Sequence, residues 1–207
     1  MIGRLKRGLL ALAALIVAST TFANGPLEAQ NTGRFRVLVP DLFALEDANR
    51  GFGEDVAEEL RDMLNELPTH QPVDKDEIED QLDRFDLRMR DLNCISTRQL
   101  GAQMNAQVAF CAEYVESDRM RELRNIKFID LGSSAEFAID GFSIDRDEKE
   151  AAAQRILDAF DTYVQQIRFR DFCYQYAQSN DWEGSLRNCD QALELNPADN
   201  GVRYQRA

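Results

Sequence analysis

Apolar residues in residues 34–165 follow two periodicities, one typical of strands and one typical of helices. The run RFRVLVP at residues 34–40 is apolar, contains β-branched residues and ends at a proline, so it predicts a strand. The run VAFCAEYV at residues 108–115 is almost continuously apolar, which predicts a strand covered on both faces. Residues 126–130 and 135–139 flank the turn sequence LGSS and predict a hairpin.

Between these strands the spacing of apolar residues becomes helical. One set falls on a single helix face: Val56, Leu60, Met63, Leu64 and Leu67. Further helices are predicted after Asp74 and Ser96, each of which has a Glu or Gln three residues later in a capping-box pattern, and Ile95 with Leu100 fits a hydrophobic staple. A helical pattern resumes at Arg146. Helices that interleave with strands predict an α+β fold with a small mixed β-sheet packed with helices.

The composition and charge of the chain exclude several classes of function. The chain has 24 Lys+Arg against 37 Asp+Glu and a net charge of −13, which argues against a nucleic-acid-binding protein. His70 is the one histidine, so histidine-based metal sites and a Ser-His-Asp triad are disfavoured. The acidic run from Asp74 to Asp80 lacks the glycine of a calcium loop, and Gly51-Phe52-Gly53 lacks the third glycine of a dinucleotide site. We therefore expect no cofactor, no metal and no catalysis.

Residues 1–23 have the three parts of a secretory signal peptide: a basic start, an apolar run at residues 9–18, and small residues before a cleavage site. Cleavage after Ala23 or after Ala29 fits the pattern. A membrane anchor is the alternative, but the apolar run is too short to span about 30 Å of hydrocarbon. We expect an exported, periplasmic protein with a linker at residues 24–33 and no membrane span after signal removal. Because no cysteine precedes Cys94, the sequence predicts that the protein is not a lipoprotein.

The order of elements in residues 34–165 resembles the amino-terminal α/β domain of TolB-type and curli-secretion (CsgG-type) periplasmic proteins. The resemblance rests on FRVLVP at residues 35–40, on the helical segment 53–67, on the Pro-Val-Asp at 72–74 with its helix, and on residues 99–113. It implies an envelope protein that binds other proteins or assembles, with no catalytic residues to carry over. The pair Cys94 and Cys111 is not part of that resemblance.

Residues 166–199 resemble one tetratricopeptide repeat, a helical hairpin with a 34-residue period. Six signature positions carry fitting residue types: Phe169, Phe172, Tyr176, Ser185, Ala192 and Pro197. Residues 200–207 resemble the start of a second repeat. The resemblance implies an all-α hairpin whose concave surface binds a protein or peptide. Because repeats bury their faces by stacking, either the chain is a truncated part of a longer array, which we favour, or the first domain covers the exposed face.

The four cysteines permit three pairings. Cys173 and Cys189 take repeat positions that face each other in an antiparallel helix pair, and a disulfide closing this loop contributes roughly 3 kcal/mol in the chain-entropy model. Cys94 lies roughly 18 Å before the turn near Ala106 along a helix, and Cys111 lies roughly 16 Å after it along a strand. We therefore prefer the two local pairs. Two small buried thiols are the alternative in the repeat, and zinc is disfavoured because no CxxC spacing occurs.

These features together predict an exported cell-envelope adaptor or scaffold, non-catalytic, that binds protein partners through the repeat. The alternative is a structural component of an envelope or secretion assembly that oligomerises through its α/β domain. The identity of the partner and the oligomeric state do not follow from the sequence.

Overall fold

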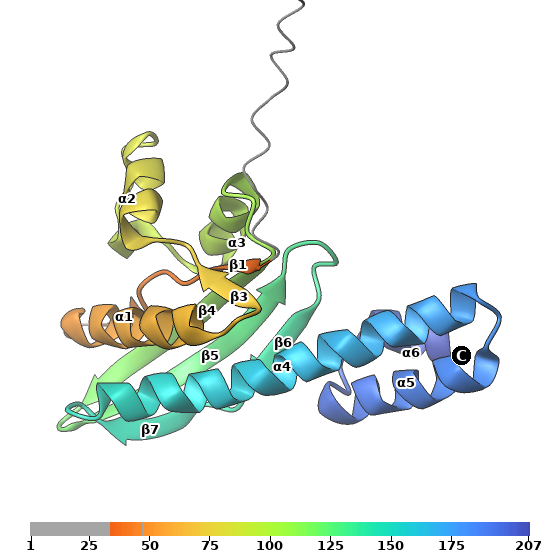
Figure 1. Cartoon of the computed structure of the whole chain (residues 1–207). Coiled ribbons are helices and arrows are strands. Elements are labelled where there is room, and N and C mark those ends of the chain that lie inside the picture. The colour runs from red at the N-terminus through yellow and green to blue at the C-terminus, as the bar shows by residue number, and fades with distance from the viewer. Residues whose placement is uncertain (1–33, 47) are drawn as a thin grey trace, which may run out of the picture. The chain divides into compact units, whose positions relative to one another are not determined.

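A mixed β-sheet lies at the centre of the structure, a computed structural model that describes residues 34–46 and 48–207 (Figure 1). The predicted signal peptide and linker lie outside these residues. The strands are β1 (Phe35–Leu38), β2 (Phe43–Ala44), β3 (His70–Pro72), β4 (Val108–Ser117), β5 (Met120–Asp130), β6 (Glu136–Ile139) and β7 (Phe142–Asp145). β3 pairs with β1, and β1 and β2 pair with β4, all in parallel. β4 pairs antiparallel with β5, which pairs antiparallel with β6 and β7.

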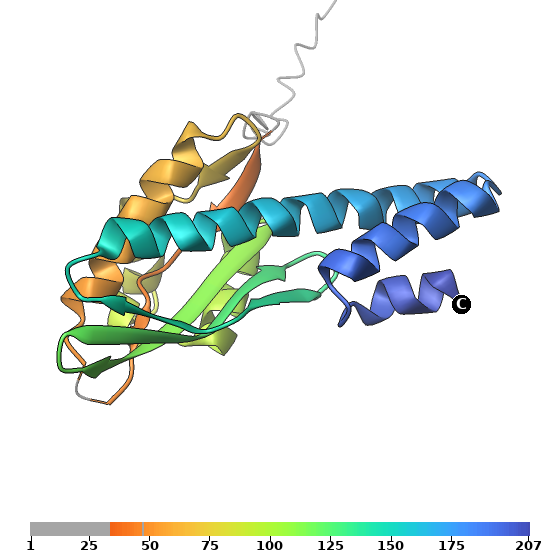
Figure 2. The ribbon, with the colours of Figure 1, turned by 90° about the horizontal axis from the view of Figure 1, so that it is seen from below.

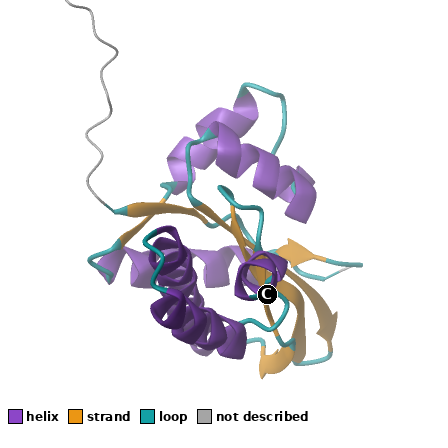
Figure 3. Ribbon diagram, turned by 90° about the vertical axis from the view of Figure 1, so that its right-hand side faces the viewer, coloured by secondary structure: helices purple, strands orange, loops and turns teal. Residues whose placement is uncertain are grey.

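Helices cover both faces of this sheet (Figure 3). They are α1 (Gly51–Glu66), α2 (Lys75–Asp83), the 3₁₀ helix η1 (Met89–Asp91), α3 (Cys94–Gln103), α4 (Lys149–Gln178), α5 (Trp182–Leu195) and α6 (Asn200–Arg206). The first core lies between the sheet, α1 and the first half of α4. The second lies between the sheet and the layer of α2, η1 and α3. The predicted small mixed sheet packed with helices is confirmed.

Strand β4 separates these two cores, and its sequence explains how. Phe110 packs on Phe128 of β5 with ring centroids 5.2 Å apart, on the side of α1 and α4. Its neighbour Ala109 points to the opposite core with Ile129. Because successive side chains of a strand alternate between faces, a strand buried on both sides must be apolar at nearly every position. The apolar run of β4 therefore indicated its place correctly.

Several local details differ from the sequence-based expectations. Helix α2 does begin after Asp74, but this residue makes no side-chain capping hydrogen bond. Helix α3 begins earlier than predicted because Asn93 caps it, accepting hydrogen bonds from the backbone N–H groups of Ile95 and Ser96 at 2.9 and 3.0 Å. Ile95 is 74% exposed, so the predicted hydrophobic staple is wrong. The predicted hairpin of β5 and β6 is confirmed.

A separate tetratricopeptide hairpin is not shown, because helix α4 joins the sheet region to the predicted repeat. Helix α4 runs unbroken for 30 residues, so the boundary expected between residues 165 and 166 falls inside one helix (Figure 2). Its first half packs on the sheet, and its second half packs on α5. Phe172 and Tyr176, expected as packing residues of a repeat, keep 37% and 39% of their surface exposed. The second half of the helix therefore continues an element of the α/β fold, and an all-α tetratricopeptide hairpin is not shown.

Within residues 34–46 and 48–207, no helix combines the length and apolar character needed to cross a bilayer.

Candidate functional site

The second half of α4 extends past the edge of the sheet, and α5 and α6 pack against it (Figures 1 and 2). We call residues 166–206 the helical extension. Asp181 begins α5 by accepting a hydrogen bond from the backbone N–H of Gly184 at 2.9 Å. Asp199 begins α6 in the same way, with the N–H of Val202 at 3.1 Å. Aspartate at these positions satisfies backbone donors that a helix start leaves free, so the sequence itself places the two turns.

A disulfide between Cys173 and Cys189 joins α4 to α5 at the centre of the extension. Both side chains are fully buried, and their Cα atoms are 4.9 Å apart. Ser185 tightens the same contact, because its hydroxyl donates to the carbonyl oxygen of Cys173 at 2.9 Å. Small side chains at this seam let the two helices approach closely, and the covalent bond fixes their register.

An ion pair holds the extension to the sheet. The guanidinium of Arg170 in α4 donates to the Asp130 carboxylate at the end of β5, with an N–O distance of 2.7 Å. Burial acts to raise the pKa of Asp130, but the hydrogen bonds from Arg170 and Ser133 outweigh this effect and hold that pKa below its usual value. The charged form of Asp130 is therefore the one that the fold stabilises.

Two further polar contacts hold the base of the extension. The amide of Gln166 in α4 donates to the Asp199 carboxylate at 2.9 Å, and both residues are buried. The amide of Asn196, which follows α5, donates to the carbonyl oxygen of Glu136 in β6 at 3.2 Å. The extension is thus attached at its base to both α4 and the β5–β6 hairpin, and we expect it to move with the sheet rather than to pivot on it.

Large apolar side chains are exposed on all three helices of the extension. The exposed fractions are 37% for Phe172, 39% for Tyr176, 66% for Trp182, 46% for Leu186 and 86% for Tyr204. Phe172 and Tyr176 lie one helical turn apart with ring centroids separated by 6.3 Å, and the Arg168 guanidinium lies 6.0 Å from the Phe172 ring. Trp182 and Leu186 have the same four-residue spacing on α5, so each pair shares one face of its helix.

The structure divides the predicted signature residues into two groups. Ala192 is buried beside the disulfide, Phe169 packs against the same small core, and Ser185 bonds across it. Phe172, Tyr176 and Pro197 are exposed. Sequence reasoning missed Trp182, Leu186 and Tyr204, although the four-residue spacing of the first two on a predicted helix was a usable signal.

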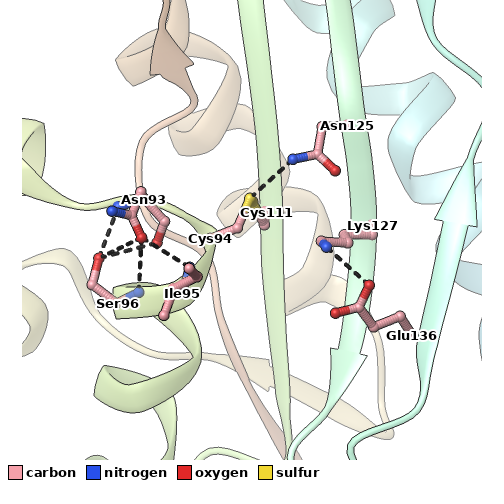
Figure 4. Close-up of a disulfide and its surroundings, with 8 residues drawn as sticks. All are labelled: Asn93, Cys94, Ile95, Ser96, Cys111, Asn125, Lys127 and Glu136. Atoms are coloured by element: carbon pink, nitrogen blue, oxygen red, sulfur yellow. Dashed lines mark hydrogen bonds and ion pairs between the residues drawn. A yellow bond between two sulfur atoms is a disulfide. The ribbon is translucent and has the colours of Figure 1, made fainter.

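A second disulfide, between Cys94 and Cys111, fastens α3 to β4 (Figure 4). Cys94 is the first residue of α3, Cys111 is fully buried in the sheet, and their Cα atoms are 5.5 Å apart. The amide of Asn125 lies 3.6 Å from the Cys94 sulfur. The two bonds are the same pairs that the cysteine spacing favoured. One joins α3 to the sheet, and the other joins the two longer helices of the extension.

Metal-ligating side chains do not cluster in the described residues. No cluster of three or more His, Cys, Asp or Glu there is placed to hold a metal ion. His70 is buried against the rings of Phe160 and Phe35, at centroid distances of 4.8 and 5.6 Å, and its Nδ1 lies 2.9 Å from the Thr69 hydroxyl. Burial and the nearby Arg34 charge lower the pKa of His70, so the ring is held neutral as a packing residue.

No protein-family model matches the sequence, and no curated protein matches it. Several solved structures resemble the fold, among them these three. The C-terminal domain of LpoB from Salmonella enterica has 11% identity and a TM-score of 0.41, covering 55% of this chain and 83% of that one. The same domain from Escherichia coli has 13% identity and a TM-score of 0.43, covering 55% and 84%. Lipoprotein GNA1162 from Neisseria meningitidis has 11% identity and a TM-score of 0.42, covering 53% and 78%.

These findings correct two sequence-based predictions. The similar structures are LpoB-like α/β domains, so the identification of a tetratricopeptide protein with a TolB/CsgG-like domain is wrong. The tetratricopeptide part of that identification relied on residue spacing, and a helix that spans sheet and extension satisfies the same spacing without forming a repeat. The TolB/CsgG part relied on the order of strands and helices. GNA1162 is named a lipoprotein, which contradicts the prediction that this chain is not one. That prediction had depended only on the lack of a cysteine before Cys94, and it is withdrawn.

Proposed function

We propose that this chain is a cell-envelope adaptor that binds protein partners through its helical extension and does not catalyse a reaction. The envelope location depends on the export signal predicted for residues 1–23. The observation that carries the proposal is the set of exposed apolar side chains on an extension that an ion pair and hydrogen bonds attach to the sheet. A mobile tail would need neither the Cys173–Cys189 disulfide nor the small buried core around it. A binding surface, in contrast, gains affinity when its conformation is fixed before the partner arrives.

Rigidity supports binding because a partner then loses less free energy in ordering the surface it meets. The disulfide fixes α4 against α5, and the contacts of Arg170 and Gln166 fix both helices to the rest of the fold. Aromatic side chains are the residues that most often dominate the energetics of protein interfaces, since they bury a large apolar area with few rotatable bonds. Phe172, Tyr176 and Trp182 supply such side chains on the extension.

Site-specific photocrosslinking in cells tests this proposal. A benzophenone amino acid replaces Tyr176 in one variant, Trp182 in a second and Glu194 in a control; Glu194 is an exposed acidic residue of α5. We expect light-dependent adducts of discrete mass from the first two variants and none of these from the control, with the partner identified by mass spectrometry. Equal adduct patterns in all three variants, or no adducts in any, contradict the proposal.

The same experiment addresses self-assembly through the α/β domain, which stays a prediction. Adducts that contain only a second copy of this chain favour an assembly component over an adaptor. Light scattering on the purified full chain provides the independent measurement of its oligomeric state.

A further inference from the structure

A cleft of about 590 Å³ lies between β2, the start of α1 and the segment that runs from α2 through η1. This volume falls within the range of clefts that hold ligands in proteins. Five consecutive residues, 41–45, line it. The strand itself is Phe43–Ala44, so the cleft follows β2 and the residues on either side of it.

The sheet leaves this edge uncovered. β1 and β2 lie one after the other along the same edge of β4, and β1 is covered in turn by β3. In the described part of the chain no strand pairs with the outer side of β2. Next to β2, the backbone of Leu42 already has a partner, because its N–H donates to the Gly53 carbonyl oxygen at 3.2 Å. The open length is therefore Phe43–Ala44, which leaves room for a short stretch of backbone pairing with another chain.

Apolar side chains form the bottom of the cleft and part of its rim. Leu82, Met89 and Leu92 are buried and reach it from the α2–η1 segment, while Leu42 reaches it from the β2 side. Leu87 lies on the rim with 39% of its surface exposed. A large apolar side chain from outside would gain contacts with this floor and shield Leu87 from water.

The charged residues that line the cleft have both signs and are mostly unpaired. Five acids and four bases line it, and among them only Glu54 and Lys75 form an ion pair. Arg50, Arg88 and Arg90 make no ion pair with any described residue. On α2 the carboxylates of Glu79 and Asp83 lie one helical turn apart, also without an ion pair among these residues. Free charges of both signs around an apolar floor suit a segment that itself carries both signs.

Asp41 adds an unsatisfied group at one end of the cleft. Its Oδ1 atom is buried without a hydrogen-bond partner and lies 3.9 Å from the Arg61 Nη1 atom. Burial raises the pKa of Asp41, against the opposing effect of Arg61 and Lys75. The Asp41 carboxylate therefore contributes negative charge to the lining of the cleft, next to the Arg61 guanidinium.

We propose that this cleft binds an extended segment of a partner protein, with one large apolar side chain on the floor and charged side chains of both signs beside it. The segment lies along β2, with an acidic side chain near Arg88 and Arg90 and a basic one near Glu79 and Asp83. This surface is separate from the helical extension, so the proposal goes beyond the adaptor function and does not need it.

Peptide selection on the intact chain tests the proposal. The probe is a phage-displayed library of random twelve-residue peptides, and enriched peptides are synthesised with a fluorophore and titrated by anisotropy. The variants are Leu87→Glu and Arg90→Glu, both at exposed positions, with Ile95→Glu as the matched control on α3 outside the cleft. Thermal unfolding of each variant verifies that the fold is retained.

We expect enriched peptides that combine an apolar residue with charges of both signs. Their Kd should rise about tenfold or more in L87E and by a smaller factor in R90E, and should stay unchanged in I95E. No enrichment over an unrelated protein, or affinities unaffected by L87E and R90E, overturns the proposal. Peptides that lose affinity in Tyr176→Asp but not in L87E also overturn it, while they leave the function of the extension standing.

Discussion

Arg170 and Asp130 are 40 positions apart in the sequence and form an ion pair whose side chains are only 11% and 13% exposed. The carboxylate also accepts the backbone N–H groups of Gly132 and Ser133 at 2.9 and 3.1 Å, so it organises the β5–β6 turn as well. One aspartate thus connects the turn of a hairpin to the middle of a long helix. The direction of the helical extension depends on this contact.

Replacing Arg170 by alanine should lower the free energy of unfolding by about 2–4 kcal/mol, because it leaves the Asp130 charge buried without its cation. Urea denaturation measures the change. The matched control is Arg187→Ala, which breaks the exposed pair with Glu183 and should cost at most about 0.5 kcal/mol. A loss below about 1 kcal/mol for Arg170→Ala would show that solvent already screens the pair.

Removing each of the two disulfides should destabilise a different part of the fold. Both close loops of similar length, with sequence separations of 16 and 17, so each double alanine variant should lose roughly 3 kcal/mol. In Cys173→Ala with Cys189→Ala, amide hydrogen exchange should accelerate in α5 and α6 while the sheet stays protected, because few other buried contacts hold that core. Equal acceleration across the sheet would mean that the extension and the sheet unfold as one unit.

The strands and helices of the sheet region were predictable where one periodicity dominated. β4 is an example, since five buried residues in succession leave no doubt about a doubly covered strand. β2 and β7 were not predicted, and β2, with two residues, is too short to show a period. Their positions follow from pairing with β4 and β5, which is a tertiary effect.

In the extension the sequence pattern predicted too much, because it indicated a repeat family as well as two packed helices. Small residues at Ser185 and Ala192 are required wherever two helices approach closely, so their presence indicated a helical hairpin correctly and a repeat family incorrectly. α4 is continuous across the boundary predicted between residues 165 and 166, and no glycine or proline there marks a helix end. Arg170 and Asp130 could not be paired from the sequence, since nothing local relates a helix to a turn 40 residues earlier.

Stability should fall as the pH decreases through the ordinary pKa of histidine, about 6.5. Burial and Arg34 lower the pKa of His70 in the folded chain, so between this lowered value and 6.5 the unfolded chain binds a proton that the folded chain does not. His70 is the one histidine, which makes the window from pH 7 to pH 5 selective for it. Urea midpoints across this window should decline in the parent and decline less in His70→Phe, and equal slopes would contradict this account.

Tyr163 offers a test of the opposite kind, a substitution that should not weaken the fold. Its ring packs against Phe128, Phe137 and Phe160, but its hydroxyl is buried without a hydrogen-bond partner. Burial raises the pKa of this hydroxyl far above its usual range, with the charge of Asp130 acting in the same direction. Tyr163→Phe keeps the packing and removes an unsatisfied polar group, so the free energy of unfolding should stay equal or rise by about 1 kcal/mol. Tyr163→Leu is the control for the ring and should destabilise. A clear loss in Tyr163→Phe, measured by urea denaturation, would show that the hydroxyl has a partner such as a buried water.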